Sequence, residues 1–432
     1  ERTSEPQAPK KRFRFSLPVK PFVDALLPKP VAGGRARRQR SVPEEKTAVV
    51  GGLALGFLLV VALITITALQ QFGGAERTQL LLEEAQETNQ EARQTQSEQD
   101  WQEALSSAEQ VLTLAPENAE AQVLAEEARL ALDALQHAAL LTAAPLVELG
   151  TSPTPRRILV AQSWLYVLNP AQDSIFGVPL AEDGITPASS APTPILKRGQ
   201  TISSEAVGHL VDMTWMEPGP GYPDGAILIY SDNGYLYIYE PSLGPMSITF
   251  QRLQGLTELD TVTLIDTYGE QFYLINRHKN QVMKYVPVNG IYDSPPRPYF
   301  APEVAPQLQT ALDMALDGRL YLLLGTGELR AYINGTEDLS FNVQNLPDPD
   351  FQPTVMAMEF HPEEGRIFLG DPISERIFVL NKRGEFQYQY RLPGSTLKQL
   401  EVLTVSQEPA VIYFVAENRI YAAPIPLTPQ TD

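Results

Sequence analysis

The sequence predicts a mainly β protein, in which a six-bladed β-propeller is preceded by one transmembrane helix and an α-helical stalk. Three stretches carry this prediction: an uncharged apolar run, a long region rich in Ala, Glu and Leu, and a strand-like pattern that recurs six times. Helices and strands leave different periodicities in a sequence, so these stretches can be told apart. The predicted parts are a basic Pro-rich cytoplasmic arm (1–47), a transmembrane helix (48–70), a helical stalk (75–141) and a propeller (145–426).

The arm at residues 1–47 carries a net charge of +7, whereas the rest of the chain carries −26. Many Pro, Arg and Lys residues without a sustained periodicity favour an extended or disordered arm. Residues 10–40 interleave cations with Phe13, Phe15 and Phe22. This pattern fits contact with anionic lipid head groups, or docking of a cytoplasmic partner. The acidic body argues against nucleic acid as a partner.

The stretch from Ala48 to Leu69 has no charged residue and very few polar ones. A helix of about 20 apolar residues crosses the hydrocarbon core of a bilayer. Four arginines lie just before it, and only Arg77 follows it closely. The positive-inside rule therefore predicts a single-pass protein of the cell membrane, with a cytoplasmic N-terminus and an extracytoplasmic propeller. The run lies too far into the chain, and is too long, for a cleavable signal peptide.

Small residues recur at four-residue spacing in this predicted helix, at Ala48, Gly52 and Gly56. Gly52 and Gly56 form a GxxxG pattern, which lets two membrane helices approach closely. These three residues are the candidate helix–helix contact of a homodimer. The alternative is that they reflect the general frequency of glycine in membrane helices.

The chain contains no cysteine, which excludes disulfides, thiolate nucleophiles and Cys-ligated metal sites. A large extracytoplasmic body without disulfides favours a bacterial protein. The sequence begins with Glu1 rather than Met. We therefore expect either a processed chain or the remainder of a longer protein, in which a cytoplasmic domain precedes Glu1.

The region from Glu76 to Leu140 is rich in helix-forming residues, and Pro116 is its single proline. Its second part resembles the second helix and exit turn of a tetratricopeptide (TPR) repeat. Trp101 matches the aromatic position of that repeat, Ala104 the small packing residue and Pro116 the helix-ending proline. Only one such unit is present. The stalk is therefore either a plain helical spacer or the wall of a peptide-binding groove.

From Ala144 onward, β-branched and aromatic residues alternate with polar ones, and the pattern recurs every 44–53 residues. The fifth copy is the clearest, with strands expected over 354–361, 365–372, 375–381 and 385–391. Six copies of four strands predict a six-bladed propeller. The sixth copy lacks an outer strand. We expect residues 145–149 to supply that strand and to close the ring.

The fifth copy resembles the NHL-type repeat, because Gly365-Arg-Ile-Phe-Leu-Gly-Asp371-Pro is followed by Arg376-Ile-Phe-Val and a Gly384 turn. The order of basic linker, membrane helix, helical stalk and propeller is similar to the C-terminal half of certain bacterial membrane proteins that carry a PP2C-like phosphatase domain. No phosphatase motif is present in these residues. The resemblance therefore implies an architecture and no activity.

No pattern in the sequence indicates catalysis, a metal site or a cofactor. The best polar candidates lie on the predicted first strands, which line the channel of a propeller: Asp212, Asp313 and Glu401. Converging carboxylates could bind a cation or a cationic ligand. The alternative is that each carboxylate caps backbone amides of a neighbouring loop.

The expected function is recognition rather than catalysis. The propeller would bind a protein, peptide or glycan as a membrane-anchored scaffold, or as the sensor half of a signalling protein. One alternative is an accessory structural subunit of a bacterial membrane complex. A second is a propeller hydrolase that depends on a divalent cation at Asp212, Asp313 and Glu401.

Overall fold

The computed structural model describes residues 77–150, 154–189, 191–244, 247–348, 350–361 and 364–426. The predicted arm and transmembrane helix, with Ala48, Gly52 and Gly56, lie outside these ranges, so those predictions stay untested. Within the described ranges, no helix is both long enough and apolar enough to span a bilayer.

Three helices precede the first strand: residues 77–95, α2 (Glu98–Leu114) and α3 (Ala119–Leu135). The side chain of Ser97 accepts a hydrogen bond from the backbone N–H of Asp100 (3.1 Å) at the start of α2. The side chain of Asn118 accepts one from Ala121 (2.9 Å) at the start of α3. Both caps satisfy N–H groups that a helix leaves without an internal partner.

The helices pack through small side chains. Trp101 and Ala104 of α2 are buried against Ala92 of the first helix and against Ala128 and Leu132 of α3. Alanine has no side chain beyond Cβ, so it allows the helix axes to approach closely. Trp101 occupies the aromatic position of the TPR-like sequence, and it packs between all three helices.

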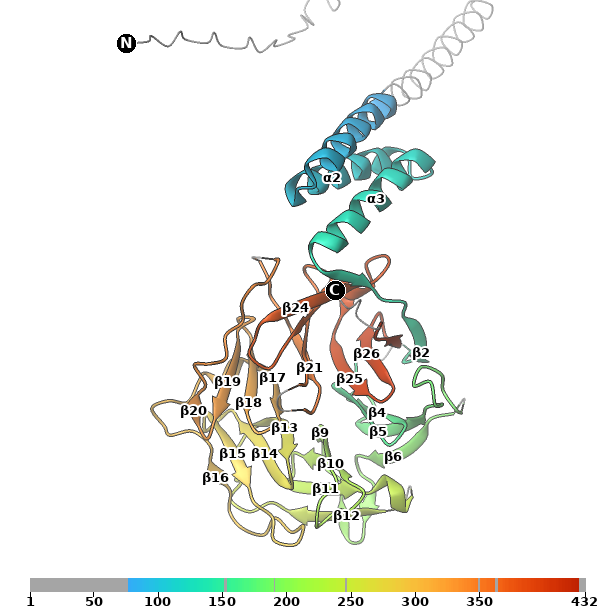
Figure 1. The fold of residues 1–432 in the computed structure, drawn as a ribbon. Coiled ribbons are helices and arrows are strands. Elements are labelled where there is room, and N and C mark those ends of the chain that lie inside the picture. Colours follow the sequence, from blue (N-terminus) through green and yellow to red (C-terminus); the bar gives the residue numbers. More distant parts are fainter. Residues whose placement is uncertain are drawn as a thin grey trace, which may run out of the picture. The chain divides into compact units, whose positions relative to one another are not determined.

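The predicted six-bladed propeller is confirmed by the pairing of the strands, and Figure 1 shows the blades arranged around a ring. Blade 1 consists of β3 (Arg157–Ala161), β4 (Trp164–Asn169), β5 (Ser174–Pro179) and β6 (Thr193–Lys197). Blade 2 consists of β9 (Leu210–Met216), β10 (Ala226–Ser231), β11 (Tyr235–Tyr239) and β12 (Ile248–Arg252). A short hairpin, β7 (Thr201–Ile202) and β8 (Glu205–Ala206), connects these two blades.

Blades 3 and 4 each end in a very short outer strand. Blade 3 consists of β13 (Val262–Tyr268), β14 (Gln271–Asn276), β15 (Gln281–Tyr285) and β16 (Arg297–Pro298). Blade 4 consists of β17 (Ala311–Leu316), β18 (Leu320–Leu324), β19 (Leu329–Ile333) and β20 (Thr336–Glu337). Asn334 and Gly335 join the last two strands with positive φ angles of 49° and 80°. The sequence Asn334-Gly335-Thr336 matches an N-glycosylation acceptor, but its first two residues form a hairpin turn.

Blades 5 and 6 each take one strand from the segment that follows α3. Blade 5 consists of β21 (Val355–Met358), β22 (Ile367–Asp371), β23 (Arg376–Leu380), β24 (Phe386–Arg391) and β1 (Ala138–Leu140). Blade 6 consists of β25 (Val402–Gln407), β26 (Ala410–Ala416), β27 (Arg419–Pro424) and β2 (Ala144–Glu148). The predicted closure of the ring is confirmed, because β2 pairs antiparallel with β27. The addition of β1, parallel to β24, was not predicted.

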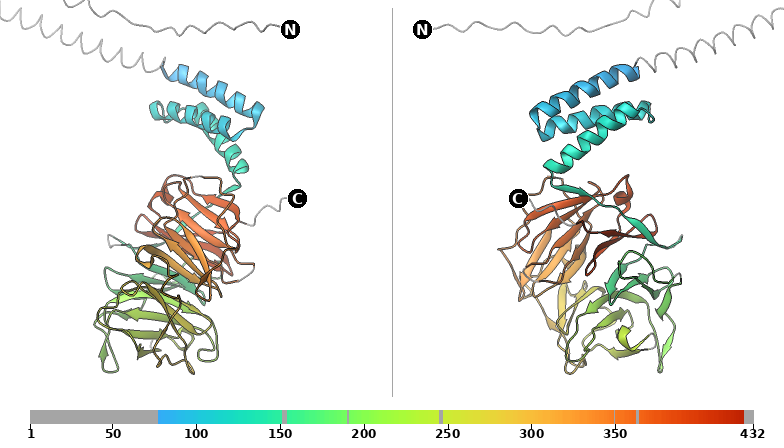
Figure 2. Two further views of the ribbon diagram at one scale, coloured as in Figure 1. Left: turned by 90° about the vertical axis from the view of Figure 1, so that its left-hand side faces the viewer. Right: turned by 45° about the vertical axis from the view of Figure 1, so that its right-hand side comes forward.

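The contact between the helices and blade 5 includes a buried ion pair. Arg391 Nε lies 2.8 Å from Asp133 Oδ1 of α3, and both side chains are nearly inaccessible to solvent. Gln389 donates a hydrogen bond to the carbonyl oxygen of Gln136 (3.2 Å). Figure 2 shows the chain running from α3 into this blade. The helical segment is therefore joined to the propeller by side chains as well as by the chain itself.

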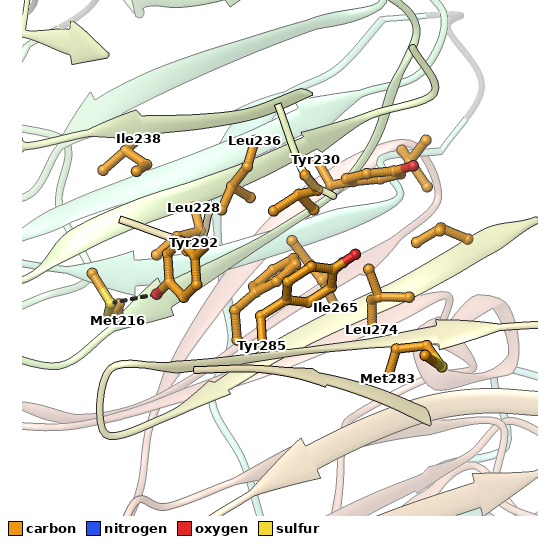
Figure 3. Close-up of a cluster of buried hydrophobic side chains, with 14 of the residues drawn as sticks. Met216, Leu228, Tyr230, Leu236, Ile238, Ile265, Leu274, Met283, Tyr285 and Tyr292 are labelled. Carbon is orange, nitrogen blue, oxygen red and sulfur yellow. Dashed lines mark hydrogen bonds between the residues drawn. The ribbon is translucent and has the colours of Figure 1, made fainter. Parts of the chain in front are cut away.

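The hydrophobic core lies between the blades, with one cluster of buried side chains for each pair of neighbours. Figure 3 shows the cluster between blades 2 and 3, where Leu228, Tyr230 and Leu236 face Leu274 and Tyr285. The cluster between blades 6 and 1 includes Leu146 of β2. The closing strand therefore adds apolar burial to the ring as well as backbone pairing.

In three blades, a side-chain oxygen stabilises the turn after the second strand by accepting a backbone hydrogen bond. The side-chain oxygens of Asn169, Asn276 and Asp371 accept hydrogen bonds from backbone N–H groups two or three residues later. Asp371 also accepts one from Gln352 (2.9 Å). Asp371 of the NHL-like sequence therefore has a structural role in this turn.

Candidate functional site

The central channel is lined by the innermost strand of each blade. The three predicted site residues lie near the start of these strands: Asp212 on β9, Asp313 on β17 and Glu401 just before β25. The fold brings Asp212 and Asp313 together, although they belong to blades 2 and 4. Glu401 is exposed and lines a cavity that Asp212 and Asp313 also line, but it does not join their ion pair.

Arg157, at the start of β3, stands between the two aspartates. Its Nε and Nη2 donate to the two carboxylate oxygens of Asp212 at 3.0 and 3.1 Å. Its Nη1 donates to Asp313 Oδ1 at 3.0 Å. The guanidinium thus occupies the place between the carboxylates and supplies the positive charge that a bound cation would otherwise supply. We call Arg157, Asp212 and Asp313 the channel triad.

The aspartates also accept hydrogen bonds from backbone N–H groups, which belong to strands rather than to a neighbouring loop. Asp212 is fully buried and accepts hydrogen bonds from Ile265 of the next blade (3.0 Å) and from Met213 (2.9 Å). Asp313 accepts one from Met314 (2.9 Å). Buried carboxylates need such donors, because an unpaired charge away from water is costly. For Asp212 and Asp313, these contacts give a structural role.

Burial and charge act in opposite directions within the channel triad. Burial disfavours the charged form of Arg157, but the carboxylates of Asp212 and Asp313 outweigh it and keep the pKa of the guanidinium well above its ordinary value. Burial raises the pKa of Asp313 above its ordinary range, although Arg157 pulls it down. Two carboxylates share one cation, so the triad keeps a net negative charge when both are ionised.

The triad separates two cavities. One, which we call the strand-end cavity, has a volume of about 310 Å³ and lies along the later residues of the innermost strands. Its ionisable lining residues are Arg157, Glu217, Asp266, Asp313 and Glu359. Glu359 is paired with Arg366 (Nε to Oε2, 2.8 Å). This cavity is therefore predominantly acidic.

Asp266 of β13 lies in the strand-end cavity. Burial raises the pKa of Asp266 to about 7. Hydrogen bonds from the Thr214 hydroxyl and the Leu316 N–H, both at 2.8 Å, lower this pKa but do not outweigh burial. The Leu316 bond connects blade 3 to blade 4, as the Ile265 bond connects blade 2 to blade 3. Burial likewise raises the pKa of Glu217.

The other cavity, which we call the strand-start cavity, has a volume of about 220 Å³. Its ionisable lining residues are Arg156, Arg157, Asp212, Arg277, Asp313 and Glu401. Arg156 donates to the carbonyl oxygen of Thr263 (2.8 Å), and Arg277 donates to that of Ala311 (2.9 Å). These two arginines reach across blade boundaries to backbone oxygens.

A larger cavity, which we call the rim groove, lies on the outside of the ring between blades 6 and 1. Its volume is about 1100 Å³. The outer strands β2 and β6 both contribute to its lining. Phe176 and Ile202 give it apolar surface, while Gln172, Ser174 and Lys197 add polar groups. Pockets of this size, with mixed lining, are typical of ligand-binding sites.

A histidine and a carboxylate also meet where the sequence showed no close cluster. His209 Nδ1 lies 2.6 Å from Asp173 Oδ2, between blades 2 and 1. Asp173 Oδ1 accepts a hydrogen bond from Leu210 (2.8 Å). Within the described residues, no group of three or more His, Cys, Asp or Glu side chains is placed to hold a metal ion.

The residues that sequence reasoning missed in the channel are Arg156, Arg157, Asp266 and Arg277. Arg157 is the first residue of β3, the innermost strand of blade 1. A charged residue at the start of a first strand was a usable signal, because that position faces the channel. Asp266 also carried a signal in the sequence, because it interrupts the apolar stretch of β13. Arg277 follows the end of its strand, and no sequence pattern marks it as a channel residue.

The sequence matches no protein-family model and no curated protein sequence. Among solved structures, the luciferin-regenerating enzyme is similar at 11% identity and a TM-score of 0.43, over 66% of this chain and 96% of that one. Regucalcin from Agrobacterium tumefaciens, titled a calcium-binding protein, is 11% identical with a TM-score of 0.40, over 67% and 95%. BBS1N in complex with ARL6DN is 13% identical with a TM-score of 0.39, over 65% and 80%. At these values the likeness adds nothing to the strand pairing described above.

Proposed function

We propose that this chain is a membrane-anchored, extracytoplasmic binding and scaffold protein, whose propeller recognises an extended segment of a protein partner in the rim groove. The observation that carries the proposal is the position of the groove between two outer edge strands, β2 and β6. Edge strands have backbone N–H and C=O groups available for pairing. An extended peptide can pair with such an edge while its side chains enter the groove.

Within this chain, one blade already pairs with an added strand at its outer edge. Strand β1 adds to the outer edge of blade 5, in parallel to β24, with Ala138 opposite Gln389 and Leu140 opposite Arg391. Three residues of extended chain are thus accommodated at the outer edge of a four-stranded blade. A partner peptide at blade 6 or blade 1 would pair with the equivalent backbone groups of β2 or β6.

The proposed scaffold role depends on the contact between the helical segment and blade 5. The Asp133–Arg391 ion pair and the β1 addition give the helical segment a defined contact with the propeller. The TPR-like and NHL-like resemblances fit a protein that holds partners in a set arrangement. The resemblance to the C-terminal half of PP2C-like membrane proteins extends the proposal to the sensor half of a signalling protein.

The two alternatives differ in what supports them. An accessory subunit of a membrane complex fits the joined helices equally well, and would use the helical surface rather than the groove. The cation-dependent hydrolase required Asp212, Asp313 and Glu401 to converge on an ion. Arg157 between the two aspartates argues against that alternative.

The groove proposal can be tested with the full chain in mild detergent. Peptides selected from a display library against the intact protein are assayed by hydrogen–deuterium exchange, read by mass spectrometry. We expect protection of the amides of β2 and β6, and at least a tenfold affinity loss in Ile202→Glu. Ile373→Glu changes an exposed residue on blade 5 and is the matched control. Protection confined to another surface, or full affinity in Ile202→Glu, would rule the groove out.

The membrane topology has a separate test, because the chain has no cysteine of its own. Ser16→Cys in the arm and Ser294→Cys on the exposed surface of blade 3 are labelled in intact cells with a membrane-impermeant maleimide. We expect labelling of Ser294→Cys in intact cells and of Ser16→Cys only after permeabilisation. The reverse result would place the propeller in the cytoplasm.

A further inference from the structure

Arg156 and Arg277 line the strand-start cavity, and neither has a carboxylate partner among the residues that the structure describes. Each donates one Nη2 hydrogen bond to a backbone carbonyl, Arg156 to Thr263 and Arg277 to Ala311. Within the described residues, every ion pair of the cavity belongs to Arg157, with Asp212 and Asp313. A guanidinium has five N–H donors, so both arginines have donors to spare. Two like charges thus border one small space, without an anion paired to either.

Two polar atoms beside this cavity lack a hydrogen-bond partner among the described residues. They are Arg277 Nε and Thr263 Oγ1, and both are covered from solvent. Thr263 is 9% exposed, and its carbonyl is the group that holds Arg156. Buried polar atoms of native proteins are nearly always paired, so an exception commonly marks the place of a water, ion or ligand.

We propose that the strand-start cavity binds a carboxylate group, held by the guanidinium groups of Arg156 and Arg277. Guanidinium presents paired N–H donors at the spacing of two carboxylate oxygens, so the contact is both charged and directional. The cavity of about 220 Å³ admits a small acid or the end of a chain. The bound oxygens would also give acceptors to the unpaired donors beside the cavity.

The charges of the cavity favour a carboxylate over a phosphate. Three carboxylates, of Asp212, Asp313 and Glu401, line it together with three arginines. A single negative charge is therefore tolerated better than the double charge of a phosphate. Glu401 lines this cavity and has the same negative charge as the proposed ligand, so it weakens binding. In a cation site, by contrast, Glu401 would strengthen binding.

The carboxylate has two possible sources: a free acid, or the terminus of a partner chain. The probes are acetate, and N-acetyl-Ala-Ala with a free or an amidated C-terminus, added to the full chain in mild detergent at constant ionic strength. We expect a saturable rise in Tm of about 2 °C at ten times Kd. A response to the free dipeptide but not to its amide, stronger than that to acetate, identifies a chain terminus. Equal responses to acetate and the free dipeptide identify a free acid.

The decisive variant is Arg156→Gln with Arg277→Gln, in which we expect the Tm response to be lost. Arg383→Gln, an exposed arginine outside the cavity, is the matched control and should respond as the unchanged chain does. No saturable response to either carboxylate, a response that survives in the double variant, or a larger response to inorganic phosphate would overturn the proposal.

A second variant keeps the test valid if the double variant does not fold. Glu401→Gln removes one exposed charge and leaves the arginines in place. We expect carboxylate to bind about two- to fivefold more tightly, because a like charge has been removed from the cavity. Unchanged or weaker binding would contradict the proposal. The cavity is separate from the rim groove, so the two sites can succeed or fail independently.

Discussion

The two cavities of the channel share Arg157 and Asp313 but differ in the charge that surrounds them. The strand-start cavity adds the arginines Arg156 and Arg277 together with the carboxylates Asp212 and Glu401. The strand-end cavity adds only carboxylates to its ionisable lining: Glu217, Asp266 and Glu359. Both are built from the same six innermost strands. The difference in charge therefore depends on where along each strand an ionisable residue falls.

In this channel, charged side chains from different blades are paired with one another. In the channel triad, an arginine from one blade takes up the charge of aspartates from two others. The strand-start side keeps donors that lack an anion. The strand-end side keeps carboxyl groups that burial pushes toward the neutral form, with the pKa of Asp266 raised to about 7. Changes to the channel triad, to the acidic strand-end side and to the strand-start side should thus affect the protein differently.

The largest effect is expected from Arg157→Met, which removes the cation that separates the cavities. Asp212 and Asp313 would stay buried without their partner, at a cost of about 3–5 kcal/mol of unfolding free energy. Urea unfolding at pH 7.5 measures the loss. The loss should become smaller as the pH is lowered, because burial raises the pKa of Asp313 and its carboxyl group then takes up a proton more readily.

Arg157→Lys is the control for this prediction. It keeps the charge but loses the fork of donors that reaches both aspartates, so we expect a smaller loss of stability. If Arg157→Met is as stable as the unchanged chain at pH 7.5, the triad does not hold the channel together, and our division into two cavities loses its basis.

An intermediate effect is expected from Asp266→Asn on the acidic side. The pKa of Asp266 is about 7 in the folded protein and about 3.9 in an unfolded chain, so the folded state binds the proton more tightly. The unfolding free energy of the unchanged chain should therefore fall as pH rises from about 4 to 7. Asparagine cannot titrate, so Asp266→Asn should gain about 3 kcal/mol relative to the unchanged chain across this window.

Urea unfolding of both proteins at pH 5 and pH 8 tests this difference. Asparagine can still accept the Leu316 hydrogen bond and donate to Thr214, so the comparison isolates the charge. A difference between the two proteins that does not change with pH would show that Asp266 is not held in its neutral form.

The smallest effect is expected from Thr263→Val at the strand-start cavity. The Thr263 hydroxyl is buried and has no hydrogen-bond partner among the described residues, so its removal should raise the unfolding free energy by about 0.5–1 kcal/mol. Thr267→Val on the same strand is the matched control. The Thr267 hydroxyl donates to the carbonyl oxygen of Trp215 (2.7 Å), so its loss should lower the unfolding free energy by about 1 kcal/mol. Equal losses in both variants would mean that Thr263 has a hydrogen-bond partner after all.

Much of the propeller could be predicted from the sequence because strands leave a local record. The four strands expected in the fifth copy, at 354–361, 365–372, 375–381 and 385–391, contain β21, β22, β23 and β24 in that order. Alternation and turn residues determine these bounds within a few residues of chain. Strand β1 has only three residues and pairs with a strand some 250 positions away, so no local pattern predicted it.

The candidate site was predicted only in part, because its contacts join distant parts of the chain. Asp212 and Asp313 were recognised as channel residues from their positions on first strands. Their partner Arg157 is 55 and 156 residues away from them. Whether these side chains meet depends on the number of blades and on the closure of the ring.

The sequence by itself determined the six repeats, the helical segment before them and the strand that closes the ring. These features follow from periodicity, turn residues and composition, which act over a few residues at a time. The tertiary structure alone decided that Arg157 takes the place between two aspartates, that Arg156 and Arg277 lack an anion, and that the helices bind blade 5. These outcomes require side chains from different blades to meet. Charge, burial and hydrogen bonding between them take effect only once the ring has closed.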